Sequence, residues 1–167
     1  GTQSGLYCFH AATRELSPYP IGGHDNQKYD IRSLLLDGDH LWIGTYAKGI
    51  RVVNLRTGAV KVYTHSRGIP YTICSNDVLC FYRGRNGEIY VGTSWGLCRY
   101  DAAKDNFMPI INIGSMISIT DMHEDMYNHL WIATSSSGVF TYNTINGHYK
   151  NYQHEREDST TITSNSI

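Results

Sequence analysis

One segment of this sequence has the spacing of a catalytic motif. Residues 92–96 read Gly-Thr-Ser-Trp-Gly, which matches the G-x-S-x-G turn that exposes a nucleophilic serine between a strand and a helix. Here the apolar alternation after Gly96 indicates a strand instead of a helix. Loops at 44–49 and 133–138 occupy the same place in a repeated phrase, so the serine belongs to a repeat. We therefore interpret Ser94 as a loop residue and predict no catalytic residue in this chain.

Histidines and carboxylates could bind a metal, but their spacing does not form a metal motif. In the H-E-x-x-H zinc motif a second histidine follows the first by four residues, whereas His154 is followed there by Asp158. Four acidic residues end two expected strands and could form a carboxylate ring or a calcium site: Asp37, Asp39, Glu124 and Asp125. We favour solvated turn residues, and we predict neither a metal nor a cofactor.

The expected loops carry side chains that suit a carbohydrate. An aromatic ring can stack on the C–H groups of a sugar, and lysine, arginine or serine can hydrogen-bond its hydroxyls or acidic substituents. One set of candidates follows the repeated phrase: Tyr46, Lys48, Trp95, Ser135, Ser136 and Ser137. A second set lies between repeats: His65, Arg67, Tyr71, His154 and Arg156. We expect Trp95 to be the main contact, and the alternative at each position is an exposed loop residue without a ligand.

A repeated phrase predicts the elements that hold these loops. Residues 41–45 read Leu-Trp-Ile-Gly-Thr, and related phrases return at 89–93 and 130–134. Each copy is followed by a glycine that leads a short apolar segment, and the leading glycines recur every 42 to 47 residues: Gly5, Gly49, Gly96 and Gly138. This is the period of a four-stranded propeller blade.

The expected fold is all-β, a segment of a β-propeller with four-stranded antiparallel blades over residues 1–167. We predict the end of one blade, three full blades and a lead-in to the next: 1–20, 31–65, 77–110, 117–154 and 155–167. Inner strands are expected at 31–36, 78–82 and 117–123, each ending in a turn rich in Asp, Gly or Asn. The segments 72–78 and 161–167 match each other, which predicts just under four blades of a larger propeller.

One large aromatic residue recurs in the second strand of each expected blade: Trp42, Tyr90 and Trp131. These rings could be stacking platforms for sugars. Because they recur once per blade within a strand, we favour packing between neighbouring blades, where large aromatic rings bury the most apolar area.

Composition excludes several classes of partner. The net charge of −1 lacks the basic footprint of a nucleic-acid-binding protein, and no apolar run is long enough to span a membrane. The cysteines form no C-x-x-C pair, so we expect buried free thiols, with a bond between Cys74 and Cys80 as the alternative; the other two are Cys8 and Cys98.

The order of a strand, an Asp/Asn-Gly turn, Leu-Trp-Ile-Gly-Thr, a loop and a glycine-led strand resembles the two-component regulator propeller repeat. Residues 161–167 are similar to the family's lead-in, and Tyr90 and Ala133 depart from its Trp and Gly. The resemblance implies a periplasmic segment of an inner-membrane hybrid two-component histidine kinase, in a propeller of seven blades. It also implies oligosaccharide sensing that regulates polysaccharide use, a homodimeric parent, and kinase domains outside this chain.

Two other classes of function stay open from the sequence. A propeller enzyme resembling a polysaccharide lyase would need His, Tyr and Arg or a metal to converge on the channel mouth. A protein–protein interaction scaffold would need an exposed apolar surface in place of a polar, aromatic cleft.

Overall fold

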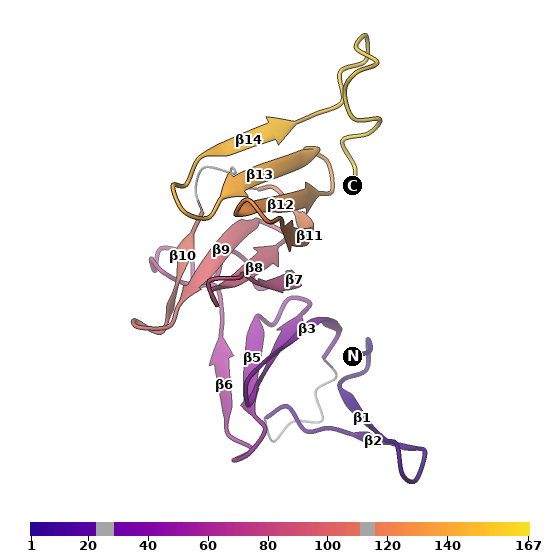
Figure 1. Cartoon of the computed structure of the whole chain (residues 1–167). Helices are drawn as coiled ribbons and strands as arrows, with labels where there is room; N and C mark the ends of the chain where they lie inside the picture. Colours follow the sequence, from indigo (N-terminus) through magenta and orange to yellow (C-terminus); the bar gives the residue numbers. More distant parts are fainter. Residues whose placement is uncertain (23–28, 111–115) are drawn as a thin grey trace.

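The computed structural model describes residues 1–22, 29–110 and 116–167. Within these residues the chain is all-β, with four antiparallel sheets and no helix. No described helix could therefore cross a membrane. The prediction of an all-β propeller of four-stranded blades is confirmed, and Figure 1 shows the blades following one another along the chain.

A two-stranded sheet and three four-stranded blades make up the described structure. The first sheet holds β1 (Tyr7–His10) and β2 (Glu15–Pro18). The first blade holds β3 (Ile31–Asp37), β4 (His40–Thr45), β5 (Ile50–Asn54) and β6 (Val60–Tyr63). The second blade holds β7 (Val78–Arg83), β8 (Ile89–Thr93), β9 (Gly96–Asp101) and β10 (Asn106–Pro109). The third blade holds β11 (Ile119–Glu124), β12 (His129–Thr134), β13 (Val139–Asn143) and β14 (Tyr149–Tyr152).

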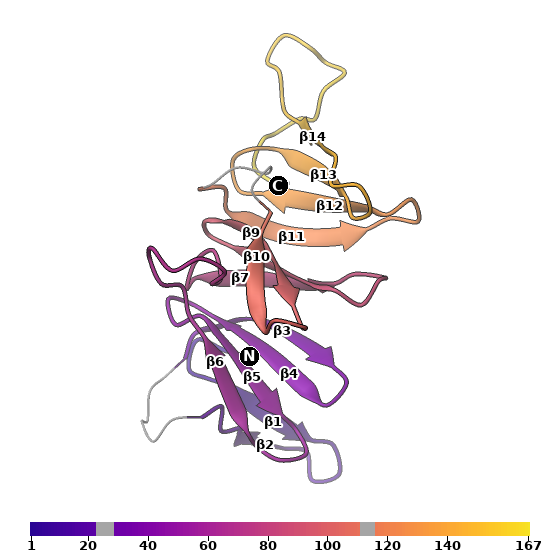
Figure 2. The ribbon, with the colours of Figure 1, turned by 90° about the vertical axis from the view of Figure 1, so that its left-hand side faces the viewer.

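The strands of each blade pair in chain order, and the blades meet through their first strands. Strand β7 contacts both β3 and β11, so these three inner strands lie side by side while β6, β10 and β14 form the outer edges (Figures 1 and 2). The β1–β2 sheet lies against the first blade (Figure 2), where Leu6 and Ile21 share a buried cluster with Ile43 and Val53.

The backbone conformation explains why a glycine precedes the third strand of the first and third blades. Gly49 and Gly138 have φ angles of 73° and 74°, in the left-handed region that side-chain-bearing residues avoid. A Cβ on Gly49 would also collide with the backbone carbonyl of Tyr63 on β6, and one on Gly138 with that of Tyr152 on β14. At these two positions the glycine is therefore required both by the turn and by the approach of the outer strand.

Aromatic residues of the repeated phrase fill the space between blades at two of three positions. Trp42 is 4% exposed and packs edge-on against Tyr100 and Phe81 of the second blade. Tyr90 is 1% exposed and lies in a cluster with residues of the third blade. Trp131 differs: it is 41% exposed and stacks on Tyr152 of its own blade. No described sheet follows the third blade, so packing between blades is confirmed for Trp42 and Tyr90 and stays a prediction for Trp131.

Two further expectations can be compared with the structure. The third inner strand starts at Ile119 instead of 117, because Ile119 already pairs with Thr134, the last residue of β12, which leaves earlier residues no strand partner. The cysteines are free, with Cys80 and Cys98 buried and Cys8 and Cys74 half-buried.

Candidate ligand-binding surface

The loops that follow the repeated phrase lie over the starts of the inner strands. In every blade a backbone N–H of this loop donates to the carbonyl of a residue just before the inner strand: Tyr46 to Asp30 (2.9 Å), Ser94 to Asp77 (3.0 Å) and Ser135 to Ser118 (3.1 Å). We call this end of the blades the loop face. The shared backbone bonds hold one set of the predicted binding residues on a single surface.

Tyr46 is exposed on the loop face and lies beside a cationic side chain. The guanidinium carbon of Arg32 lies 5.1 Å from the centre of the Tyr46 ring, and Arg32 also forms a 3.0 Å ion pair with Asp30. The Lys48 side chain extends over Tyr29, with its ammonium 4.8 Å from the centre of that ring. Tyr46 therefore belongs to a polar group with Arg32 and Asp30, whereas Lys48 contacts Tyr29.

Trp95 is the most open aromatic side chain of the predicted set. Its side chain is 59% exposed, and its backbone N–H donates to Thr93 Oγ1 (3.2 Å), which fixes the loop. The neighbouring Ser94 hydroxyl lies 3.0 Å from the Ser75 hydroxyl. The loop leads into strand β9, so Ser94 lacks the helix of a nucleophile elbow.

Asp77 is a loop-face residue that sequence reasoning missed. One of its carboxylate oxygens is buried and has no hydrogen-bond partner among the described residues. Burial raises the pKa of Asp77, while the charge of Arg32 opposes that rise and the charge of Asp30 adds to it. The residue lies near Arg32 and Asp30, and its carbonyl holds the Ser94 loop. Its unpartnered oxygen is covered, so a neighbouring side chain must move before a ligand hydroxyl can donate to it. Its sequence signal is its place at the end of the lead-in segment 72–78.

The other predicted residues lie on different parts of the blades. Ser135 and Ser136 are exposed in the loop of the third blade. Tyr71 is exposed and its carbonyl accepts a 2.9 Å bond from the N–H of Phe107, which places it against β10, the outermost strand of the second blade. Arg67 is exposed in the same connection. The structure therefore brings Tyr46 and the Trp95 loop into one region, and sets Arg67 and Tyr71 along the outer edge.

Two predicted histidines have a structural role in the connections between blades. The Nδ1 atom of His65 lies 2.7 Å from the Ile73 carbonyl, and that of His154 lies 2.8 Å from the Ile162 carbonyl. The backbone N–H of His65 donates to the Asn76 side chain, and that of His154 donates to the Asn165 side chain, both over 2.6 Å. Both histidines therefore close their own loops.

The four acidic turn residues do not form a ring. Asp37 pairs with Arg83 of the second blade, and Asp39 pairs with Arg56. Glu124 is buried and accepts bonds from the backbone of Arg85 and from Thr144, while Asp125 accepts from the indole of Trp131. Over the described ranges no group of three metal-ligating side chains is found.

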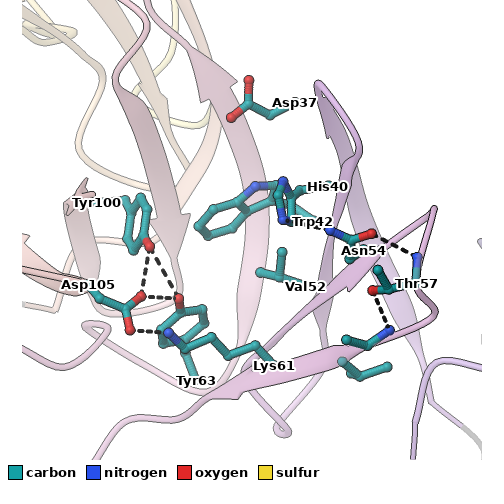
Figure 3. Close-up of a pocket in the computed structure, with 12 residues that line it drawn as sticks. Asp37, His40, Trp42, Val52, Asn54, Thr57, Lys61, Tyr63, Tyr100 and Asp105 are labelled. Atoms are coloured by element: carbon teal, nitrogen blue, oxygen red, sulfur yellow. Dashed lines mark hydrogen bonds and ion pairs between the residues drawn. The ribbon is translucent and has the colours of Figure 1, made fainter. Parts of the chain in front are cut away.

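A separate cavity of about 470 Å³ lies between the first and second blades. His40, at the start of β4, lines it, whereas Tyr46 follows the end of the same strand. The cavity therefore opens at the end of the blade opposite the loop face. Figure 3 shows Trp42 on one wall and Tyr63, Tyr100 and Asp105 on another.

Comparison with known proteins supports the fold and the repeat. A family model described as the two component regulator propeller matches residues 72–95. The predicted resemblance to two-component regulator propeller repeats is confirmed, and the chain is an all-β propeller that carries such a repeat. No curated protein matches the sequence.

Solved structures with the same fold include two from B. thetaiotaomicron. The extracellular domain of BT3049, described as a hybrid two component system, superposes with a TM-score of 0.78 at 24% identity over 99% of this chain. The corresponding domain of BT4673 gives 0.68 at 20% identity over the whole chain. This chain spans 21% and 27% of their lengths. YCF48 bound to D1 peptide gives a TM-score of 0.63 at 11% identity, over 91% of this chain and 49% of YCF48.

Proposed function

We propose that this chain is an extracytoplasmic ligand-binding propeller of a hybrid two-component signalling protein, and that it binds an oligosaccharide on the loop face. The regulator propeller match at 72–95 and the extracellular domains of BT3049 and BT4673 support the signalling part. In this proposal the protein is a periplasmic part of an inner-membrane histidine kinase, its kinase domains lie outside these residues, the parent is a homodimer, and the signal regulates polysaccharide use.

The main support for an oligosaccharide ligand is that the loop face holds both an open aromatic ring and a buried acceptor without a hydrogen-bond partner. Trp95 offers a 59% exposed indole to the apolar face of a sugar. Asp77 offers a buried carboxylate oxygen without a partner in the described structure, and an unsatisfied buried acceptor gains most from a new hydrogen bond. Arg32 and Tyr46 add a donor and a second ring. Sugars require this combination of stacking surface and hydrogen-bonding groups.

A peptide ligand is the second candidate. The loop face and the adjoining connection expose several large apolar side chains: Tyr46, Ile69, Tyr71 and Trp95. YCF48, which shares the fold, was solved with a bound peptide. A peptide would use these apolar groups without needing Asp77.

Thermal shift separates the two candidates. A ligand that binds only the folded state raises the melting temperature in a saturable manner, so the chain is screened against defined plant, host and microbial oligosaccharides and against a peptide library. We expect a shift with one glycan class that is lost in Trp95→Ala and in Asp77→Asn. Tyr149→Ala is the matched control, because Tyr149 is an exposed aromatic residue on the outer strand β14. A shift with peptides alone contradicts the glycan proposal.

A further inference from the structure

The wall of the cavity between the first and second blades carries a shorter side chain than the same position of the second blade. In the first blade the aromatic Trp42 pairs across β4 and β5 with Val52. In the second blade the equivalent Tyr90 pairs with Arg99. The Arg99 side chain reaches Glu88 over 2.6 Å, and Glu88 also accepts a 3.0 Å bond from the Tyr90 hydroxyl. Val52 is too short to make such a contact, and it lines the cavity of the first blade.

The cavity has a buried donor without a partner. Trp42 is 4% exposed, and its indole Nε1 has no hydrogen-bond partner among the described residues. In the third blade the equivalent indole of Trp131 donates to Asp125 over 2.9 Å. Asp37 is the equivalent of Asp125 in the first blade, but its carboxylate pairs with Arg83 of the second blade at 3.1 Å. A buried N–H without an acceptor loses the hydrogen bond that it would make in water, so a ligand oxygen near Trp42 would stabilise the site.

The charges around the cavity are already balanced. Asp37 is paired with Arg83. Asp105 accepts bonds from Lys61, from the Tyr63 hydroxyl (2.5 Å) and from the Tyr100 hydroxyl (2.7 Å), as Figure 3 shows. These bonds, with that from Lys61 the strongest, lower the pKa of Asp105 to about 2, so it is a carboxylate at neutral pH. Both carboxylates already have partners, so neither is left to attract a charged ligand.

We propose that the cavity beside Trp42 binds a neutral sugar of one or two rings. Because Nε1 is covered in the free structure, a side chain of the cavity wall must shift when the sugar binds. A hydroxyl then placed between Asp37 and Trp42 would donate to the carboxylate and accept from the indole. Val52 and the aromatic walls suit the C–H face of the sugar ring, and His40 and Asn54 line the opening with polar groups. The volume of about 470 Å³ lies within the roughly 300–1,000 Å³ of small-molecule sites. This site is distinct from the loop face and shares with the proposed function only the class of ligand.

The three tryptophans of the chain allow the two sites to be followed separately. In an ¹⁵N-labelled full chain, each indole N–H gives one resonance, assigned with single Trp→Phe variants. Trp42 reports on the cavity, Trp95 on the loop face, and Trp131, which donates to Asp125, serves as the internal reference. The probes are D-glucose, D-galactose and maltose, with D-glucuronate as the charged comparison.

We expect a saturable shift of the Trp42 resonance with at least one neutral sugar, and an at least about tenfold weaker response to glucuronate. The double variant His40→Glu/Val52→Arg copies the Glu88 and Arg99 arrangement of the second blade and should abolish the shift. Ala59→Leu, which fills the cavity from a different wall, is the second variant in case the first does not fold. Both variants should leave any shift of Trp95 unchanged.

Each other outcome decides against one of the two sites. A Trp42 resonance that does not move with any neutral sugar, or that moves equally in the filled variants, overturns the cavity proposal. A saturable Trp95 shift without a Trp42 shift overturns it as well, while supporting the loop face. A Trp42 shift without a Trp95 shift upholds the cavity and counts against the loop face for that sugar.

Discussion

The hydroxyl of Thr45 donates a 2.7 Å hydrogen bond to the backbone carbonyl of Gly49, and both residues are buried. The same bond joins Thr93 to Gly96 at 2.8 Å and Thr134 to Gly138 at 2.7 Å. The final threonine of the repeated phrase thus closes the loop that carries the candidate binding residues. The repeat therefore specifies a buried hydrogen bond as well as a pair of strands.

Replacing Thr45 with valine should destabilise the fold. The variant keeps the side-chain volume and removes the buried hydroxyl, so the expected loss is about 1–2 kcal/mol of unfolding free energy. Urea unfolding followed by tryptophan fluorescence measures it. Thr13→Val, at an exposed turn residue, is the control and should change stability by less than about 0.5 kcal/mol. Equal stability of the two variants would show that the Thr45 bond contributes nothing.

Replacing Gly49 with alanine should cost more than the same change at Gly87. Both glycines have positive φ angles, 73° and 81°, so both variants carry the strain of a left-handed residue, roughly 1–2 kcal/mol. Only at Gly49 would the new Cβ collide with a backbone atom, the carbonyl of Tyr63, whereas the space around Gly87 is open. Thermal unfolding of both variants tests this difference, and a lower melting temperature for Gly87→Ala would refute it.

Acid should destabilise the chain partly through Asp105. Its folded pKa of about 2 lies below the usual value for an aspartate, 3.8, chiefly because of the Lys61 and Tyr63 hydrogen bonds. A depressed carboxyl pKa adds stability that is present above the unfolded pKa and is lost as pH falls through the folded pKa. Between about pH 4 and pH 2 the melting temperature of the wild type should therefore fall more steeply than that of Asp105→Asn. Parallel curves for the two proteins would contradict this assignment.

Cysteine reactivity should follow burial. The thiolate is the reactive form, and burial, the largest cause, raises the pKa of Cys80 to about 12. Burial likewise raises the pKa of Cys98, and the neighbouring Cys74 thiol adds to that rise. Iodoacetamide at pH 8 should therefore modify Cys8 in the folded chain and leave Cys80 and Cys98 unmodified until urea is added. Mass spectrometry of the peptides measures this order, and early labelling of Cys80 would disprove it.

Much of the fold could be predicted from the sequence because its determinants are local. The alternation of side chains and the glycine-led phrases predicted inner strands at 31–36 and 78–82, and the structure has them at Ile31–Asp37 and Val78–Arg83. The third inner strand was predicted from residue 117 but begins at Ile119, because the start of a strand depends on which residues of the neighbouring strand can pair with it. Gly49 could be recognised from its place in the repeat, since its backbone angle is a property of one residue.

The binding surfaces depended on tertiary structure. The sequence alone identified Tyr46 and Trp95 as loop aromatics, since loop position and residue type are local properties. Only the packing of one blade on the next revealed Asp77 as a buried acceptor and Trp42 as a donor without a partner. The pairing of Asp37 with Arg83 joins residues 46 positions apart, and it determines whether the Trp42 indole has an acceptor. Side chains from different blades meet only after the chain has folded, so their hydrogen bonds and the cavity they enclose are properties of the tertiary structure.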